Sequence, residues 1–267
     1  MGNAFFVVWR ESLEAFLIAG ILYAWLKAND DSGAGRRALF GGLAAGVGLA
    51  LLLGWALLTV QDELTGEALE IFQTATLLLA AGLITQMVLW MRKHGRGIKA
   101  RLHADLAAAA EQSGYLGVAV VAALAVAREG AETVIFLYGL AQGGEISALI
   151  IGSISGLGVA GLTAWVAAKS LARLNLALLL RLSAILLLVL ASALLVAALD
   201  RLVGAGYLPA LLDPVWDSSQ WLDDTTKSGK LFADFSGYRA RPALSELIIW
   251  AAYWGSVIFF WRRTSRG

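Results

Sequence analysis

Long apolar stretches alternate with shorter polar ones along the whole chain. A membrane-spanning helix needs about 20 predominantly apolar residues, and seven stretches meet that requirement. They cover residues 4–27, 38–60, 68–91, 115–141, 146–168, 176–199 and 244–261. The pattern therefore predicts an all-α, polytopic membrane protein with seven transmembrane helices.

Composition agrees with this prediction. Hydrophobic residues make up 59% of the 267 residues, charged residues 15%, and the mean hydropathy is +0.71, whereas soluble domains are about one quarter charged. The net charge of +1 gives no reason to expect a nucleic-acid partner. We expect the chain to be embedded in the lipid bilayer. The N-terminus lacks a basic region, and Arg10 and Glu11 interrupt its apolar run, so we expect a first mature helix from Ala4 rather than a signal peptide.

Lysine and arginine predict the orientation, because they are enriched in cytoplasmic loops. With the N-terminus outside and the C-terminus inside, fourteen of these residues lie on the inner side and five on the outer side. All five outer ones fall in one long polar segment, at about 200–243, which we expect to be an external loop. The linker 94–114 is basic and its composition allows a helix.

The pattern R-E-x-x-E occurs twice, as Arg10 to Glu14 and as Arg128 to Glu132, at an offset of 118 residues. The first copy lies in a helix running inward and the second in one running outward. This predicts a 3+3 inverted repeat, with units at about 4–93 and 115–203 and a last helix at 244–262, in a single transmembrane permease domain, 1–267. Inverted repeats of this kind place transport sites near the bilayer midplane. The pair Gly42 and Gly46, repeated as Gly152 and Gly156, has the spacing at which membrane helices pack closely.

The two motifs place six charges inside apolar helices, at an unpaired cost of about 15–20 kcal/mol. Each arginine can pair with the glutamate four residues on, and each motif then keeps one net negative charge that a cation or a proton must balance. We therefore predict a metal site of Glu11, Glu14, Glu129 and Glu132, with Arg10 and Arg128 as charge-pairing support. Glu70, early in the third stretch, is a further candidate ligand.

Oxygen ligands suit hard cations, which include iron, Mn²⁺, Mg²⁺ and Ca²⁺, and protons remain an alternative. No cysteine is present, and the two histidines, His94 and His103, lie in the basic linker region. Neither histidine forms the Glu-x-x-His pair of a di-iron oxidase, so a membrane-embedded carboxylate metal oxidase is the weaker reading. Ion pairs that only tie helices together are the other alternative. No ATP-binding G-x-x-x-x-G-K-[ST] pattern occurs.

The doubled R-E-x-x-E motif in a seven-helix chain resembles the oxidase-dependent iron permease family. The segments PVWDSS at 214–219 and GYRARP at 237–242 resemble the late loop of that family. The resemblance implies uptake of iron, as Fe³⁺ or as Fe²⁺ oxidised during uptake, by Glu11, Glu14, Glu129 and Glu132. It implies a multi-pass permease of the cell membrane, in bacteria the inner membrane, that is not itself an enzyme. Iron would be the transported substrate, no cofactor would be bound permanently, and a separate oxidase or periplasmic iron-binding protein would be the partner. Pb²⁺ and Mn²⁺ remain alternative substrates.

Overall fold

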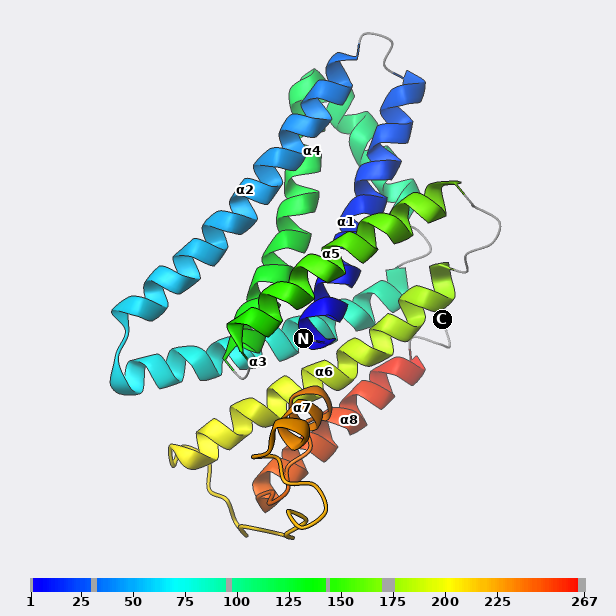
Figure 1. Cartoon of the computed structure of the whole chain (residues 1–267). Helices are drawn as coiled ribbons and strands as arrows, with labels where there is room; N and C mark the ends of the chain where they lie inside the picture. The colour runs from blue at the N-terminus through cyan, green and yellow to red at the C-terminus, as the bar shows by residue number, and fades with distance from the viewer. Residues whose placement is uncertain (1, 30–32, 95–97, 143–144, 170–175, 264–267) are drawn as a thin grey trace. The chain divides into compact units, whose positions relative to one another are not determined.

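The structure is a computed structural model that describes residues 2–29, 33–94, 98–142, 145–169 and 176–263. Those residues are helical apart from turns and the external loop, and none of them forms a strand. The helices are α1 (Gly2–Asn29), α2 (Ala34–Glu63), α3 (Gly66–His94), α4 (Ile98–Ala141), α5 (Ile146–Lys169), α6 (Leu176–Gly204), α7 (Lys227–Ser236) and α8 (Leu244–Arg263) (Figure 1). The all-α prediction is confirmed.

Each predicted apolar stretch falls on a helix, and the basic linker is helical from Ile98 onward, as its composition allowed. Gly114, at φ 57° and ψ −139°, breaks α4 into this linker helix and the apolar helix that follows. Within the part of the chain that the structure describes, five helices are long and apolar enough to cross a membrane: α2, α3, α5, α6 and α8. The other two predicted spans, α1 and the second part of α4, carry the motif charges. Among the basic residues counted for orientation, Arg96, Arg173 and Arg266 lie outside the described residues.

The eighth helix, α7, is not among the seven predicted, and it lies inside the external loop. The Thr226 side chain accepts a hydrogen bond from the Gly229 backbone N–H at its start, and Gly237 ends it with a left-handed φ of 75°. Threonine and glycine are favoured at these two capping positions. A ten-residue amphipathic segment is too short to cross a bilayer, which is why hydropathy alone does not reveal it.

The chain divides into two compact units. The first contains residues 1–62, 94–138 and 144–180, and the second contains residues 63–93, 139–143 and 181–267. The first unit therefore holds α1, α2, most of α4, and α5. The second holds α3, α6, α7 and α8. The first unit therefore contains the first and second helices of both predicted repeats. The second unit contains the third helix of each repeat.

In the first unit, each motif helix packs against the glycine-bearing helix of the other predicted repeat. A β-carbon at Gly156 of α5 would lie 2.6 Å from the Phe5 carbonyl oxygen and 3.1 Å from the Trp9 nitrogen of α1. A β-carbon at Gly46 of α2 would lie 2.7 Å from the Ala123 carbonyl oxygen and 3.0 Å from the Ala127 nitrogen of α4. Phe5 and Trp9 precede Ala123 and Ala127 by the same offset as the two motifs. The two helix contacts are therefore equivalent positions of one repeated pattern.

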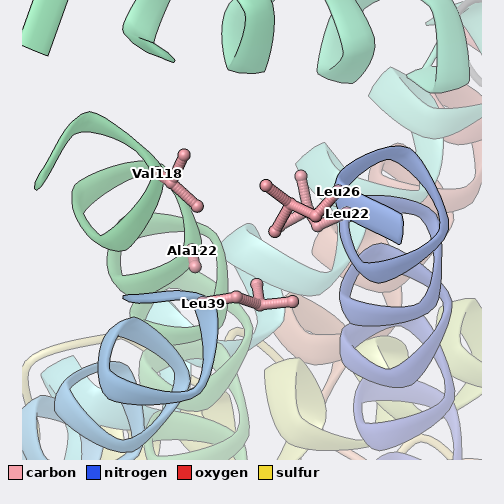
Figure 2. Close-up of a cluster of buried hydrophobic side chains, with 5 residues drawn as sticks. All are labelled: Leu22, Leu26, Leu39, Val118 and Ala122. Atoms are coloured by element: carbon pink, nitrogen blue, oxygen red, sulfur yellow. The ribbon is translucent and has the colours of Figure 1, made fainter. Parts of the chain in front are cut away.

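A small buried cluster fixes the relative direction of α1 and α4. Leu22 and Leu26, near the end of α1, pack with Val118 and Ala122, which follow the Gly114 break in α4, and with Leu39 of α2 (Figure 2). Since the end of α1 meets the beginning of the apolar part of α4, the two motif helices run in opposite directions, as an inverted repeat requires.

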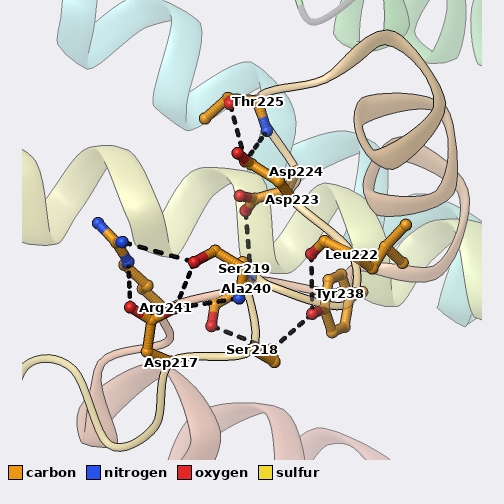
Figure 3. A network of polar contacts seen from close by, with 10 residues as sticks. All are labelled: Asp217, Ser218, Ser219, Leu222, Asp223, Asp224, Thr225, Tyr238, Ala240 and Arg241. Carbon is orange, nitrogen blue, oxygen red and sulfur yellow. Dashed lines mark hydrogen bonds and ion pairs between the residues drawn. The ribbon is translucent and has the colours of Figure 1, made fainter.

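The second unit is tied together by contacts between its long helices. The Tyr253 hydroxyl of α8 lies 3.0 Å from the Thr85 hydroxyl of α3 and 3.4 Å from the Leu188 carbonyl oxygen of α6. In the external loop, Ser218 and Tyr238 hydroxyls are 2.6 Å apart, and Arg241 Nε donates to Asp217 Oδ2 at 3.0 Å (Figure 3). Arg239 joins the loop to the end of α6 through an ion pair with Asp200.

Candidate metal centre

The antiparallel packing of α1 and α4 brings the two R-E-x-x-E motifs to one level. Sequence positions alone put the first motif near the start of its helix and the second near the middle, so their depths need not have matched. The cluster of Leu22, Leu26, Val118 and Ala122 sets the register. The first motif precedes this cluster along α1, and the second motif follows it along α4 at a similar distance. Glu11, Glu14 and Glu129 consequently meet.

Arg10 holds the first motif together from a fully buried position. Its Nη1 donates to Glu11 Oε1 at 2.7 Å, and its Nη2 lies 2.8 Å from Glu14 Oε1. The second contact is an ion pair without hydrogen-bond geometry, since Glu14 Oε1 has no hydrogen-bond partner among the described residues. Arg10 and Glu11 are each only 1% exposed. One guanidinium therefore orients two carboxylates, as a planar fork with several donors can.

The second motif repeats the pairing in a looser form. Arg128 Nε donates to Glu132 Oε1 at 3.2 Å across one helical turn, and the Arg128 side chain is 50% exposed. Glu132 Oε2 is buried and has no hydrogen-bond partner among the described residues. The two arginines have matching sequence positions, but only Arg10 is enclosed by the protein.

Three carboxylates form a group that is able to hold a metal ion. One oxygen each of Glu11, Glu14 and Glu129 lies within 4.8 Å of the others. Opposite oxygens around a small hard cation are about 4 Å apart, given metal–oxygen bonds of about 2.0–2.2 Å, so a slight inward rotation of the side chains brings them to ligand distance. Glu11 Oε2 is buried with no hydrogen-bond partner among the described residues. Arg10 thus occupies one oxygen of Glu11 and leaves the other for a cation.

Charge balance favours a cation in this group. Four ionised glutamates and two arginines leave a net charge of −2 in a region of apolar helices. Burying uncompensated charge is costly, and a bound metal ion offsets it directly. A hard cation or protons would balance this charge, and the group itself offers only carboxylate oxygens as ligands.

An apolar cavity of about 520 Å³ in the first unit reaches Glu11 and Glu129. The rest of its wall is mainly aliphatic, for example Val47, Leu51 and Ile154. The hydroxyls of Thr133 and Ser153 on this wall donate to carbonyl oxygens of their own helices. Apart from the two glutamates, such a wall offers few groups that could replace the water around a metal ion.

Glu70, the fifth predicted ligand, is not in the three-carboxylate group. It is exposed in the second unit, where it lines a separate cavity with Gln73, Arg201 and Tyr207.

Sequence reasoning also passed over Glu246, which is 4% exposed at the start of α8. Glu246 Oε2 accepts a hydrogen bond from the Ala243 N–H at 3.3 Å. A glutamate at the third helical position that reaches back to the capping residue is the signal that could have revealed it.

The fold and the carboxylate group define a helical, multi-pass membrane protein with a group of buried carboxylates among its helices, a combination that suits the class of metal permeases. The model of the iron permease FTR1 family matches residues 1–262, and the chain belongs to that family.

The chain is 30% identical over 255 residues to the "Ferrous iron permease EfeU" of Escherichia coli O6:K15:H31 (strain 536 / UPEC) and to that of Shigella sonnei (strain Ss046). Each alignment covers 93% of this chain and 91% of the relative. A "Ferrous iron permease EfeU" of Yersinia pestis is 28% identical over 255 residues, which is 93% of this chain and 89% of the relative. No solved structure matches the chain.

Proposed function

We propose that the chain is a membrane permease that takes up iron, and that the ion is coordinated by Glu11, Glu14 and Glu129 and handed on through Glu132. The observation that carries this is the meeting of three buried or half-buried carboxylates from two membrane helices at one point. Family membership supports iron as the substrate, and the relatives' names as permeases support a transporter rather than an enzyme. Glu70 stays a predicted further carboxylate for the ion.

We further propose seven membrane spans with the N-terminus outside and the C-terminus inside, in the inner membrane of a bacterium. The equivalent contacts of α1 with α5 and of α4 with α2 support the inverted repeat. Rocking of the two repeats about the site would expose the carboxylates to each side in turn. Oxidation of Fe²⁺ during uptake would require a separate oxidase or periplasmic partner, which stays a prediction from the family resemblance.

The test is ⁵⁵Fe uptake into proteoliposomes that contain the purified protein. Glu14→Gln and Glu132→Gln remove one charge each and keep the side-chain shape. We expect initial rates to fall at least about tenfold, because changes even beyond the direct ligands alter metal affinity by about 10–100-fold. Fe²⁺ and chelated Fe³⁺ are supplied separately, with Mn²⁺ and Pb²⁺ as competitors.

The matched control is Glu63→Gln, at the exposed end of α2, which should transport like the unmodified chain. Well-folded Glu14→Gln and Glu132→Gln proteins that transport at the control rate would show that the motifs only join helices. The same conclusion would follow if both variants were expressed poorly but each folded molecule transported iron at the normal rate.

A further inference from the structure

A second cavity, of about 730 Å³, lies in the second unit between the beginning of α3 and the end of α6. Its polar wall contains Glu70, Gln73, Arg201 and Tyr207. Its apolar wall contains Ile71, Ala75 and Leu78 of α3, together with Leu202 and Ala205. Both helices are long and apolar enough to cross a membrane, and the cavity lies at their ends, where the hydrocarbon core gives way to lipid headgroups.

The polar wall is held in place by hydrogen bonds within the unit. Arg201 Nη1 donates to Gln73 Oε1 at 2.7 Å, which links α6 to α3. The Tyr207 hydroxyl donates to Glu67, and this bond raises the pKa of Tyr207. The cavity then presents a guanidinium from Arg201 and a carboxylate from Glu70.

The apolar wall continues from these charges along the spanning helix. Ile71, Ala75 and Leu78 are spaced so that they share one face of α3. Ile71 is 50% exposed and Leu78 is 38% exposed. The exposed face of a spanning helix contacts acyl chains. The cavity therefore joins one positive charge, one negative charge and an aliphatic strip in a single surface.

We propose that this cavity is a binding site for a zwitterionic phospholipid whose headgroup ends in a primary ammonium. The phosphate contacts Arg201, which suits the planar guanidinium fork. The ammonium donates to Glu70, and an acyl chain follows Ile71, Ala75 and Leu78. Phosphatidylethanolamine meets all three conditions. Phosphatidylcholine has no N–H to donate, and phosphatidylglycerol brings a net negative charge toward Glu70 without an ammonium.

The experiment is native mass spectrometry of the purified full chain after removal of lipid and addition of an equimolar mixture of phosphatidylethanolamine, phosphatidylcholine and phosphatidylglycerol with identical acyl chains. We expect the ethanolamine lipid to be retained about fivefold or more over either competitor, since hydrogen bonds to charged groups are among the stronger ones. Equal retention of the three lipids by the unmodified protein would overturn the proposal.

Two variants assign the headgroup contacts. Glu70→Gln should abolish the protein's preference for the ethanolamine over the glycerol headgroup. The substitution removes both the carboxylate that pairs with the ammonium and the repulsion between that carboxylate and phosphatidylglycerol. Arg201→Gln should lower retention of all three lipids, and Arg201→Lys should restore part of it. The matched control is Arg181→Gln, an exposed arginine elsewhere on α6. A Glu70→Gln protein with an unchanged preference, or an Arg181→Gln protein with the same losses as Arg201→Gln, would also overturn the site.

Discussion

At the scale of single residues, the two motif arginines have the same sequence context but different surroundings. The Arg10 side chain is 2% exposed and pairs with Glu11 and Glu14, whereas the Arg128 side chain is 50% exposed and pairs with Glu132. Removing one partner of a buried ion pair costs far more than removing one partner of an exposed pair, because the remaining charge stays uncompensated.

We therefore predict that Arg10→Met destabilises the protein by about 3–5 kcal/mol, and that Arg128→Met costs less, because the Arg128 side chain is half exposed and its loss leaves Glu132 alone without its ion-pair partner. Methionine keeps an unbranched side chain of similar reach in both cases. The measurement is thermal unfolding of the two purified variants in the same detergent, beside the unmodified chain. Equal losses for both variants would contradict the different burial of the two arginines.

At the scale of helices, glycines of the first unit divide into two sets. A β-carbon at Gly46 or Gly156 would come within 3 Å of backbone atoms of the neighbouring helix, while one at Gly48 or Gly158 would meet nothing within 4 Å. The close set fixes the α2–α4 and α1–α5 contacts. The open set lies two residues further along the same helices.

We predict that Gly46→Ala and Gly156→Ala each destabilise the protein by about 1–3 kcal/mol, because the added methyl group forces the helices apart. Gly48→Ala and Gly158→Ala should be neutral or stabilise by up to about 1 kcal/mol, since alanine is the better helix former. Unfolding temperatures of the four variants give the comparison. If Gly48→Ala or Gly158→Ala lowered the unfolding temperature as much as Gly46→Ala or Gly156→Ala, helix flexibility rather than close packing would explain the effect.

The external loop has its own pH-dependent element. The hydroxyl and backbone N–H of Ser219 donate to Asp217, at 2.6 and 3.0 Å, and these bonds lower the pKa of Asp217. Because the pKa is lower in the folded loop, this contribution to stability is fully present above the unfolded value of about 3.9. It is lost as the pH falls through the lowered pKa of the folded state.

We predict that hydrogen-exchange protection of residues 214–226, corrected for intrinsic exchange rates, is constant from neutral pH to about pH 4 and declines only at lower pH. Asp217→Asn should show weaker protection already at neutral pH, because the carboxylate that accepts from Ser219 and Arg241 is replaced by an amide. Protection in Asp217→Asn that matches the unmodified chain at neutral pH would show that the turn does not depend on this carboxylate.

At the scale of the whole molecule, hydropathy was enough to place each of the seven apolar stretches on a helix, because a long apolar run satisfies its backbone polar groups within a helix. How many of these helices cross the membrane stays a prediction. The repeated motif also pointed to the carboxylates that meet in the first unit. Three things were beyond the sequence: that α1 pairs with α5 and α2 with α4, that only Arg10 is enclosed, and that α7 exists. Pairing and burial depend on which helix faces meet, and α7 depends on local capping at Thr226 and Gly237.

Orientation in the membrane is the remaining whole-molecule prediction, and the chain is well suited to test it because it contains no cysteine. Thr65, between α2 and α3, should lie outside, and Ala28, at the end of α1, should lie inside. In intact cells a membrane-impermeant maleimide should label Thr65→Cys and leave Ala28→Cys unlabelled until the cells are permeabilised. The unmodified chain supplies a background without thiols. Labelling of Ala28→Cys in intact cells would reverse the orientation. The end of α1 that carries the motif would then face the cytoplasm, and the carboxylates of Glu11 and Glu14 would meet the ion last rather than first.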